Sequence, residues 1–232
     1  MLGALTARQA CVLHNACLAD AVALVNAFTA SSFAKPCQPW LYVSGSASQA
    51  RALGKALGLS KQWRVEAQRG GDLGDRMRNA CADLFRGGCA KVIIIGTDTP
   101  WMGPRRLALA LRALDRVDVV LGPASDGGYY LVGARKTLPA KLLLEIFRAI
   151  NWGSSSVLQR TVENIHRHKI PMRLLPRDFD LDRPSDLARA AKTLRRSPER
   201  SPALAAWITG NRTIKMGLSE RERATSESSR RR

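Results

Sequence analysis

The feature that most constrains the fold is a strand-length apolar run that stops at a glycine. Val92 to Ile95 are apolar at every position, Gly96 ends the run, and Asp98 follows at once. A strand without polar alternation is buried on both faces, as in sheets covered by helices on each side. In such sheets ligands bind beyond the carboxyl ends of the strands. Asp98 is therefore a candidate for holding a metal-bound phosphate, with a turn or a helix cap before Pro104 as the structural alternative.

Strand-like and helix-like segments alternate along the first 194 residues. The alternation predicts a three-layer α/β/α sandwich. Helices are expected at residues 6–28, 46 or 48 to 57, 72–85, 104–114, 142–150, 154–166 and 184–194, and strands at 40–43, 64–68, 91–95, 117–121, 129–132 and 172–175.

The pattern changes at residue 197, where Ser, Arg, Glu and Thr become dominant. This composition predicts a largely disordered basic tail over 197–232, with one helical turn near Ala203–Ile208 as an alternative, after a single domain over 1–196.

Charge and cysteine usage narrow the function classes. The net charge is +18, and residues 1–194 alone hold 27 basic and 15 acidic residues, which suits an anionic substrate such as a nucleotide. The arginines are scattered without aromatic interleaving, so specific nucleic-acid binding is not favoured. The five cysteines include no CxxC pair and are expected to be reduced thiols of a cytoplasmic protein. No run of 18 apolar residues occurs, so no membrane span is expected.

A glycine-rich turn precedes the helix expected at residue 72. Gly70, Gly71 and Asp72 open it, and Arg76 follows one turn into the helix. Backbone N–H groups at such a helix start suit an anion, and Arg76 can reach a phosphate or ribose. Asp72 can equally be only a helix cap, with Arg76 a solvated side chain.

Acidic residues further along the chain supply the other candidates. Asp180 and Asp182 alternate in an extended segment, where residues two apart point the same way and can share a cation. Asp182 could instead cap the helix that Pro184 begins. Asp126, in Ser-Asp-Gly-Gly-Tyr-Tyr, could act as a base, contact an acceptor or form an Asx-turn.

An aromatic residue and a serine join the helices expected at 142–150 and 154–166. Trp152 is a candidate platform for a sugar or base, and Ser154 is a candidate helix cap. His166 and His168 fit no metal signature.

Six motifs in fixed order carry a resemblance to a known family. They are Gly70-Gly-Asp-Leu-Gly-Asp-Arg-Met77, Ile95-Gly-Thr-Asp-Thr-Pro100, Val119-Val-Leu-Gly-Pro123, Ser125-Asp-Gly-Gly-Tyr-Tyr-Leu131, Trp152-Gly-Ser154 and Asp180-Leu-Asp-Arg-Pro-Ser-Asp-Leu187. Together they resemble the radical-SAM/selenodomain-associated transferase family, of the GT-A or nucleotide-diphospho-sugar transferase fold. More distantly the chain is similar to the 2-phospholactate and molybdenum-cofactor guanylyltransferases.

The resemblance implies a glycosyltransferase-like enzyme that uses a nucleotide-sugar donor, a small-molecule acceptor and Mg²⁺ or Mn²⁺. It implies Asp98, Asp180 and Asp182 as metal ligands, and Gly71, Asp72, Arg76, Thr97, Trp152 and Ser154 as donor-binding residues. Asp126 is the candidate catalytic base if the reaction inverts stereochemistry. A nucleotidyltransferase using a nucleoside triphosphate is the alternative reaction.

Family members begin with a strand and a basic glycine-containing loop that this sequence lacks ahead of Leu2. The first central strand is therefore expected to be missing, through an upstream start codon or a degraded gene. A truncated, noncatalytic nucleotide-binding protein is the third functional alternative.

Overall fold

The computed structural model describes residues 5–32 and 36–211. The chain divides into two compact units. The sheet unit comprises residues 24–96 and 103–180. The helical unit comprises residues 1–23, 97–102 and 181–232, of which 5–23, 97–102 and 181–211 are described. Each unit is described separately below.

The sheet unit contains two β-sheets. Strands β1 (Trp40–Val43) and β2 (Arg64–Ala67) form a parallel pair. The second sheet has the order β3-β5-β4-β6, with β3 (Lys91–Ile95) and β4 (Val119–Pro123) antiparallel to β5 (Tyr129–Arg135). Strand β6 (Met172–Leu174) runs parallel to β4. Among the described residues no ladder joins the two sheets.

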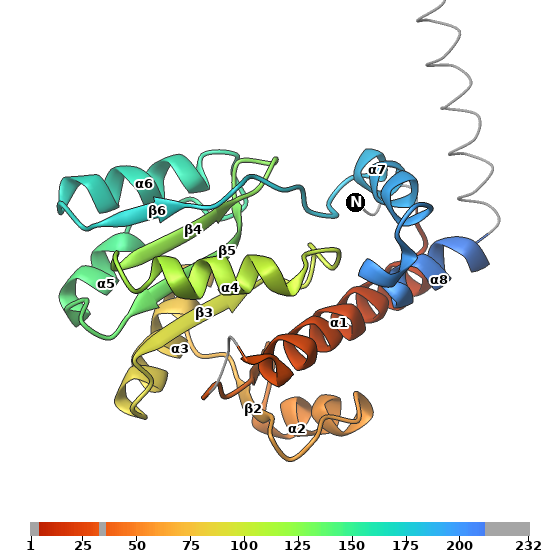
Figure 1. Cartoon of the computed structure of the whole chain (residues 1–232), viewed down its shortest axis with the longest axis horizontal. Helices are drawn as coiled ribbons and strands as arrows, with labels where there is room; N and C mark the ends of the chain where they lie inside the picture. The colour runs from red at the N-terminus through yellow and green to blue at the C-terminus, as the bar shows by residue number, and fades with distance from the viewer. Residues whose placement is uncertain (1–4, 33–35, 212–232) are drawn as a thin grey trace, which may run out of the picture. The chain divides into compact units, whose positions relative to one another are not determined.

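Helices cover both faces of the four-stranded sheet (Figure 1). Helices α3 (Leu73–Arg86), α5 (Ala140–Ile146) and α6 (Val157–Arg167) pack on one face with alternate residues of β4 and β5, including Val119, Leu121 and Val132. Helix α4 (Pro104–Ala113) lies on the other face. There Leu114 packs so closely on Gly133 that a Cβ at residue 133 would lie 3.1 Å from Leu114 Cδ1. The predicted three-layer α/β arrangement is confirmed.

Helix α2 (Ala47–Ala56) covers the parallel pair of β1 and β2. Ser46 begins it with a capping box, because the Ser46 hydroxyl accepts the Gln49 N–H and the Gln49 side chain accepts the Ser46 N–H.

A buried carboxylate organises the helical unit. Asp20 lies on α1 (Ala7–Ala30), whose residues up to Ala23 belong to this unit. Asp20 accepts hydrogen bonds from the Ser201 hydroxyl at 2.5 Å and from the N–H groups of Ala203 and Leu204, both at 2.9 Å. These donors stand at the start of α8 (Pro202–Gly210), so α1 supplies the cap that α8 lacks locally. Helix α7 (Pro184–Leu194) and the 3₁₀ turn η3 (Pro198–Arg200) complete the unit.

The structure corrects the expectation of disorder for residues 197–211. Helix α8 buries Leu204 completely and Trp207 almost completely, so its apolar face offsets the entropy of ordering it. Residues 212–232, the rest of the predicted tail, lie outside the described residues.

Helix α1 is also the one helix of the described residues that is long and apolar enough to cross a membrane, judged by length and composition alone. Because 44% of its most apolar window is buried within the protein, and core helices of soluble proteins meet the same test, this is weak support for a span. The expected absence of a span stays a prediction.

The five cysteines are free thiols, as expected. Cys17 and Cys81 are buried, and the other three are partly or fully exposed. Burial raises the pKa of the Cys81 thiol to about 12. Burial also raises the pKa of Cys17 to about 12, with smaller contributions from Asp20 and Asp98. Both thiols are therefore protonated at neutral pH, and a protonated thiol is a poor nucleophile.

Candidate active site

A tight turn between β4 and β5 positions Asp126. The Gly128 N–H donates to Asp126 Oδ1 at 2.7 Å, which is the Asx-turn anticipated as one alternative for this residue. The turn is closed by a hydrogen bond of 3.0 Å from the Ala124 N–H to the Gly128 carbonyl. Gly127 has a φ of 97°, and a Cβ there would lie 2.0 Å from the Ser155 carbonyl oxygen. Only glycine fits, so the turn is fixed in place.

The segment that carries Asp180 runs beside this turn. The Asp178 N–H donates to the Pro123 carbonyl, and the Ser125 hydroxyl donates to the Asp178 carbonyl, both at 3.0 Å. As a result, carboxylate oxygens of Asp126 and Asp180 lie within 4.8 Å of each other, although the residues are far apart in sequence. Asp180 is buried, with 8% of its surface exposed, whereas Asp126 is exposed. Two converging carboxylates of this kind form a plausible oxygen ligand set for a hard divalent cation.

An aromatic and cationic anchor holds the start of that segment. The Tyr130 hydroxyl donates to the Pro176 carbonyl at 3.0 Å. The Arg106 guanidinium lies 5.6 Å from the centre of the Tyr130 ring and 3.4 Å from Asp178 Oδ2. Burial and the Asp178 charge raise the pKa of Tyr130 above its ordinary value, against the opposing Arg106 charge. A Cβ at Gly122 would lie 2.4 Å from the Tyr130 ring, so glycine is required beside it.

The predicted ligands Asp98 and Asp182 belong to the helical unit, together with the half-buried Thr97. The carbonyl of Asp98 accepts the Leu181 N–H at 2.9 Å, so the main chain after β3 lies beside the residue that separates Asp180 from Asp182. The covalent chain itself keeps the Cα atoms of Asp180 and Asp182 within about 7 Å. The metal role of Asp98 and Asp182 stays a prediction.

The N-cap position of α7 is Arg183 and not Asp182, which was the structural alternative for it. Helix α7 is capped instead by Asp186, whose Oδ2 accepts the N–H groups of Arg183 at 2.7 Å and Asp182 at 3.3 Å. The side chain of Asp182, which is exposed, is therefore not needed as the cap.

The glycine-rich turn before α3 has the predicted local structure. Asp72 caps the helix, because its Oδ1 accepts the Asp75 N–H at 2.7 Å. Arg76 folds back toward the turn, with Nε 3.4 Å from the Gly70 carbonyl and Nη1 3.4 Å from Gln68 Oε1. Gly71 and Asp72 are exposed. These contacts give Asp72 and Arg76 a structural role, and donor binding by Gly71, Asp72 and Arg76 stays a prediction.

Trp152 packs against protein on several sides. A Cβ at Gly74 would lie 2.6 Å from Trp152 Cζ2, so the indole occupies the space that the missing side chain leaves open. The rings of Tyr129 and Phe147 each lie with their centres 6.4 Å from the Trp152 ring. Trp152 thus joins the start of α3 to the start of β5. These contacts favour a packing role, and the predicted platform for a sugar or base gains no support from them.

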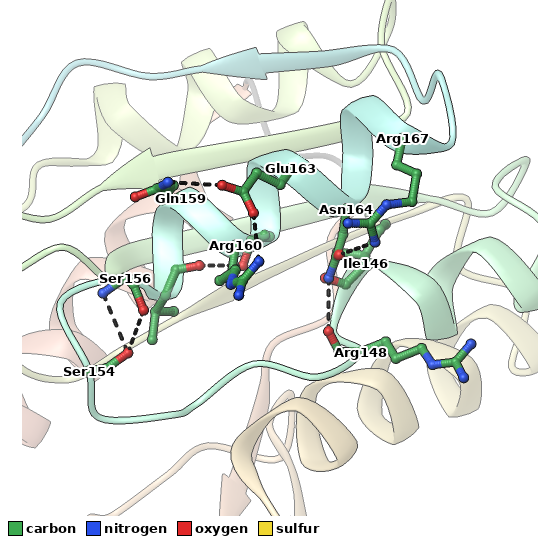
Figure 2. A network of polar contacts seen from close by, with 11 residues as sticks. Ile146, Arg148, Ser154, Ser156, Gln159, Arg160, Glu163, Asn164 and Arg167 are labelled. Atoms are coloured by element: carbon green, nitrogen blue, oxygen red, sulfur yellow. Dashed lines mark hydrogen bonds and ion pairs between the residues drawn. The ribbon is translucent and has the colours of Figure 1, made fainter.

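Ser154 is not the cap of α6. The helix begins at Val157, and the Ser154 hydroxyl donates to the Asn151 carbonyl at 2.8 Å in the preceding turn. The Ser154 hydroxyl also lies 2.8 Å from the Ser156 hydroxyl (Figure 2). Figure 2 also shows the buried Asn164, whose amide donates to the carbonyls of Arg148 at 2.9 Å and Ile146 at 3.3 Å. Asn164 thereby satisfies carbonyls at the end of α5 and fixes where the connection carrying Trp152 begins.

Two cavities of the sheet unit are lined by residues other than Asp126 and Asp180. One, of about 360 Å³, is lined by Lys91, Asp115 and Arg135 at the far end of β3 from Gly96. The other, of about 520 Å³, lies between α2 and β2.

Comparisons with known proteins bear on the fold. A solved candidate nucleotide-diphospho-sugar transferase from Desulfovibrio desulfuricans G20 is 28% identical with a TM-score of 0.79, covering 91% of this chain and 87% of that one. A cytidylyltransferase from Leptospira borgpetersenii serovar Hardjo-bovis is 13% identical with a TM-score of 0.49, covering 85% of this chain and 84% of that one, which is too distant to bear on function. No curated protein matches.

The resemblance to the radical-SAM/selenodomain-associated transferase family stays a prediction. The family DUF2064, described as "Uncharacterized protein conserved in bacteria", matches residues 29–154, just over half of the chain. The chain belongs to the DUF2064 family.

Proposed function

We propose that this protein is a metal-dependent transferase that uses a nucleotide-sugar donor. The observation that carries the proposal is the pair of carboxylates of Asp126 and Asp180, within 4.8 Å of each other beside the end of β4. The pair occurs in a fold shared with a candidate nucleotide-diphospho-sugar transferase along 91% of the chain. A nucleotide sugar carries a diphosphate, and such groups are commonly bound to proteins through a divalent cation.

The residues present fit Mg²⁺ or Mn²⁺. Carboxylate oxygens are the ligands that these cations prefer, and two carboxylates held this close repel each other unless positive charge offsets them. Asp126 and Asp180 would hold the ion, with Asp182 two residues further along the chain as the next candidate. When bound, the ion would neutralise negative charge that develops on the departing nucleotide diphosphate.

The geometry favours Asp126 as a ligand over its predicted role as a catalytic base. One of its oxygens already accepts the Gly128 N–H, and a carboxylate oxygen of the buried Asp180 lies close by. A general base needs a free oxygen within hydrogen-bond reach of the acceptor hydroxyl, and a rigid Asx-turn restricts that reach. Within the proposal, the Asx-turn therefore orients Asp126 toward the cation.

The charge of the chain supports an anionic substrate. The net charge of +18 raises the local concentration of nucleotides around the protein. Around the site itself, Arg106 is bonded to Asp178 and Arg177 to the Ala124 carbonyl, so both cations hold the segments that carry the two carboxylates. A bound metal would add positive charge at the diphosphate.

The test is metal-dependent binding of nucleoside diphosphates, measured by calorimetry and by electron paramagnetic resonance of Mn²⁺. Asp126→Asn and Asp180→Asn should each weaken Mn²⁺ binding by at least about tenfold, since even outer-shell changes at metal sites cost that much. Glu163→Gln, on the exposed side of α6, is the control and should bind as the unaltered protein does. Asp98→Asn tests the ligand role predicted for that residue from sequence.

The reaction is assayed with Mn²⁺ and radiolabelled nucleotide sugars, and in parallel with nucleoside triphosphates. Release of nucleoside diphosphate from a nucleotide sugar supports the proposal. Release of pyrophosphate from a triphosphate would instead assign a nucleotidyltransferase. Metal-independent binding, or no binding of either ligand class, would overturn the proposal in favour of a noncatalytic protein.

A further inference from the structure

Strand β2 has one edge occupied and one edge open. Its partner is β1, and the Arg64 N–H donates to the Pro39 carbonyl at 3.1 Å while the Gln68 N–H donates to the Val43 carbonyl at 2.8 Å. Backbone groups alternate in direction along a strand, so the N–H and C=O of Val65 and Ala67 point away from β1. In the ranges that the structure describes, no second strand pairs with β2.

A groove lies between α2 and β2. The cavity of about 520 Å³ between α2 and β2 is lined by residues from both faces of β2. Val65 faces α2, where a Cβ at Gly54 would lie 2.9 Å from Val65 Cγ2, while Arg64 and Glu66 project from the opposite face.

The groove is positively charged. Arg51 and Lys55 line it from α2 and Arg64 lines it from β2, against the single carboxylate of Glu66, and all four side chains are exposed. A second copy of this chain, at a net charge of +18, would be repelled as a whole. Residues 212–232 hold seven basic and three acidic residues, so they are a poor electrostatic match as well. Charge complementarity therefore favours an acidic occupant.

We propose that the open edge of β2 binds an acidic, extended segment of a partner protein by strand addition. The N–H and C=O groups of Val65 and Ala67 would pair with the backbone of that segment. Arg51 and Lys55 would contact its carboxylates, which set the specificity of the groove for acidic sequences. The proposal is independent of the transferase chemistry, because none of these residues belongs to the carboxylate site.

The test uses a fluorescein-labelled twelve-residue peptide that alternates glutamate with threonine or valine, and measures anisotropy on the full chain. Ala67→Pro removes an N–H that points away from β1 and leaves the Gln68 bond intact, so it blocks strand addition without removing a bond between β1 and β2. It should weaken peptide binding about three- to tenfold. Ala67→Val keeps the N–H and should bind like the unaltered protein.

The charge requirement is tested separately. Arg51→Glu combined with Lys55→Glu should weaken binding of the same peptide by at least about tenfold, and a version of the peptide with lysine in place of glutamate should not bind. Circular dichroism of each variant verifies that the fold is retained.

Three results would overturn the proposal. They are the absence of binding by the acidic peptide, equal binding by Ala67→Pro and Ala67→Val, and a single-stranded oligonucleotide that binds more tightly than the peptide with no effect of Ala67→Pro. The last result would assign the groove to nonspecific polyanion binding.

Discussion

The contact between Gly74 and Trp152 makes a sharp prediction about the first turn of α3. Replacing glycine by alanine in a helix ordinarily stabilises it by about 0.5–1 kcal/mol. In Gly74→Ala, however, the new Cβ would lie 2.6 Å from Trp152 Cζ2, 3.0 Å from Trp152 Cε2 and 3.1 Å from Phe147 Cβ, closer than ordinary contact. Overpacking of this kind costs about 1–3 kcal/mol. We expect a net loss of about 1–2 kcal/mol in the free energy of unfolding.

The measurement is urea unfolding at 25 °C, followed by far-UV circular dichroism. Gly71→Ala is the matched control in the same turn, where the nearest atom to a Cβ is 3.8 Å away, and should change stability by less than about 0.5 kcal/mol. Trp152→Phe removes the fused ring that collides with the new methyl group. In the Trp152→Phe background, Gly74→Ala should therefore cost less, with a coupling of about 0.5–2 kcal/mol.

The reasoning is refuted if Gly74→Ala is as stable as the unaltered protein, or if its cost is the same in both backgrounds. Either result would mean that the indole does not occupy the space beside Gly74. Trp152 would then again be open to interpretation as a ligand platform.

Two further predictions concern buried and paired carboxylates. Asp20→Ala leaves the Ser201 hydroxyl and two N–H groups at the start of α8 without their acceptor, so we expect a loss of about 2–4 kcal/mol and faster hydrogen exchange in α8 by mass spectrometry. At Asp83, burial opposes ionisation, but hydrogen bonds from Arg69 and Arg86 hold the pKa below its ordinary value. A lowered folded-state pKa stabilises the protein above the unfolded pKa, so Asp83→Asn should destabilise by about 1 kcal/mol at pH 7 in thermal unfolding, and the difference should vanish once the pH falls below the folded pKa.

Local sequence signals predicted the elements well because each signal acts over a few residues. The apolar run at 92–95, the cap at Asp72 and the proline at residue 184 each specify a strand or a helix start without help from the rest of the chain. The caps that were misplaced depend on other contacts. Ser154 bonds within a preceding turn, and the cap of α7 comes from Asp186 inside the helix.

Contacts between residues far apart in the chain could not be predicted from the sequence. Helix α8 was expected only as a possible single turn near Ala203–Ile208, because its cap, Asp20, precedes it by 181 to 184 residues, and because polar residues surround its short apolar face. The pairing of Asp126 with Asp180 depends on hydrogen bonds between Pro123 and Asp178, which no local pattern reveals. Nor can an isolated tryptophan indicate whether its ring faces protein or ligand, so donor binding by Trp152 stays a prediction.

The dependence of α8 on Asp20 sets a practical limit for anyone who trims this protein for crystallisation. A version ending near residue 196, where the composition changes, would remove the Ser201 hydroxyl and the Ala203 and Leu204 N–H groups that bond to Asp20. It would also remove the buried side chains of α8 from the helical unit. Such a fragment should express poorly or aggregate. Truncation after Asn211 preserves the arrangement and discards only residues whose removal touches none of these bonds.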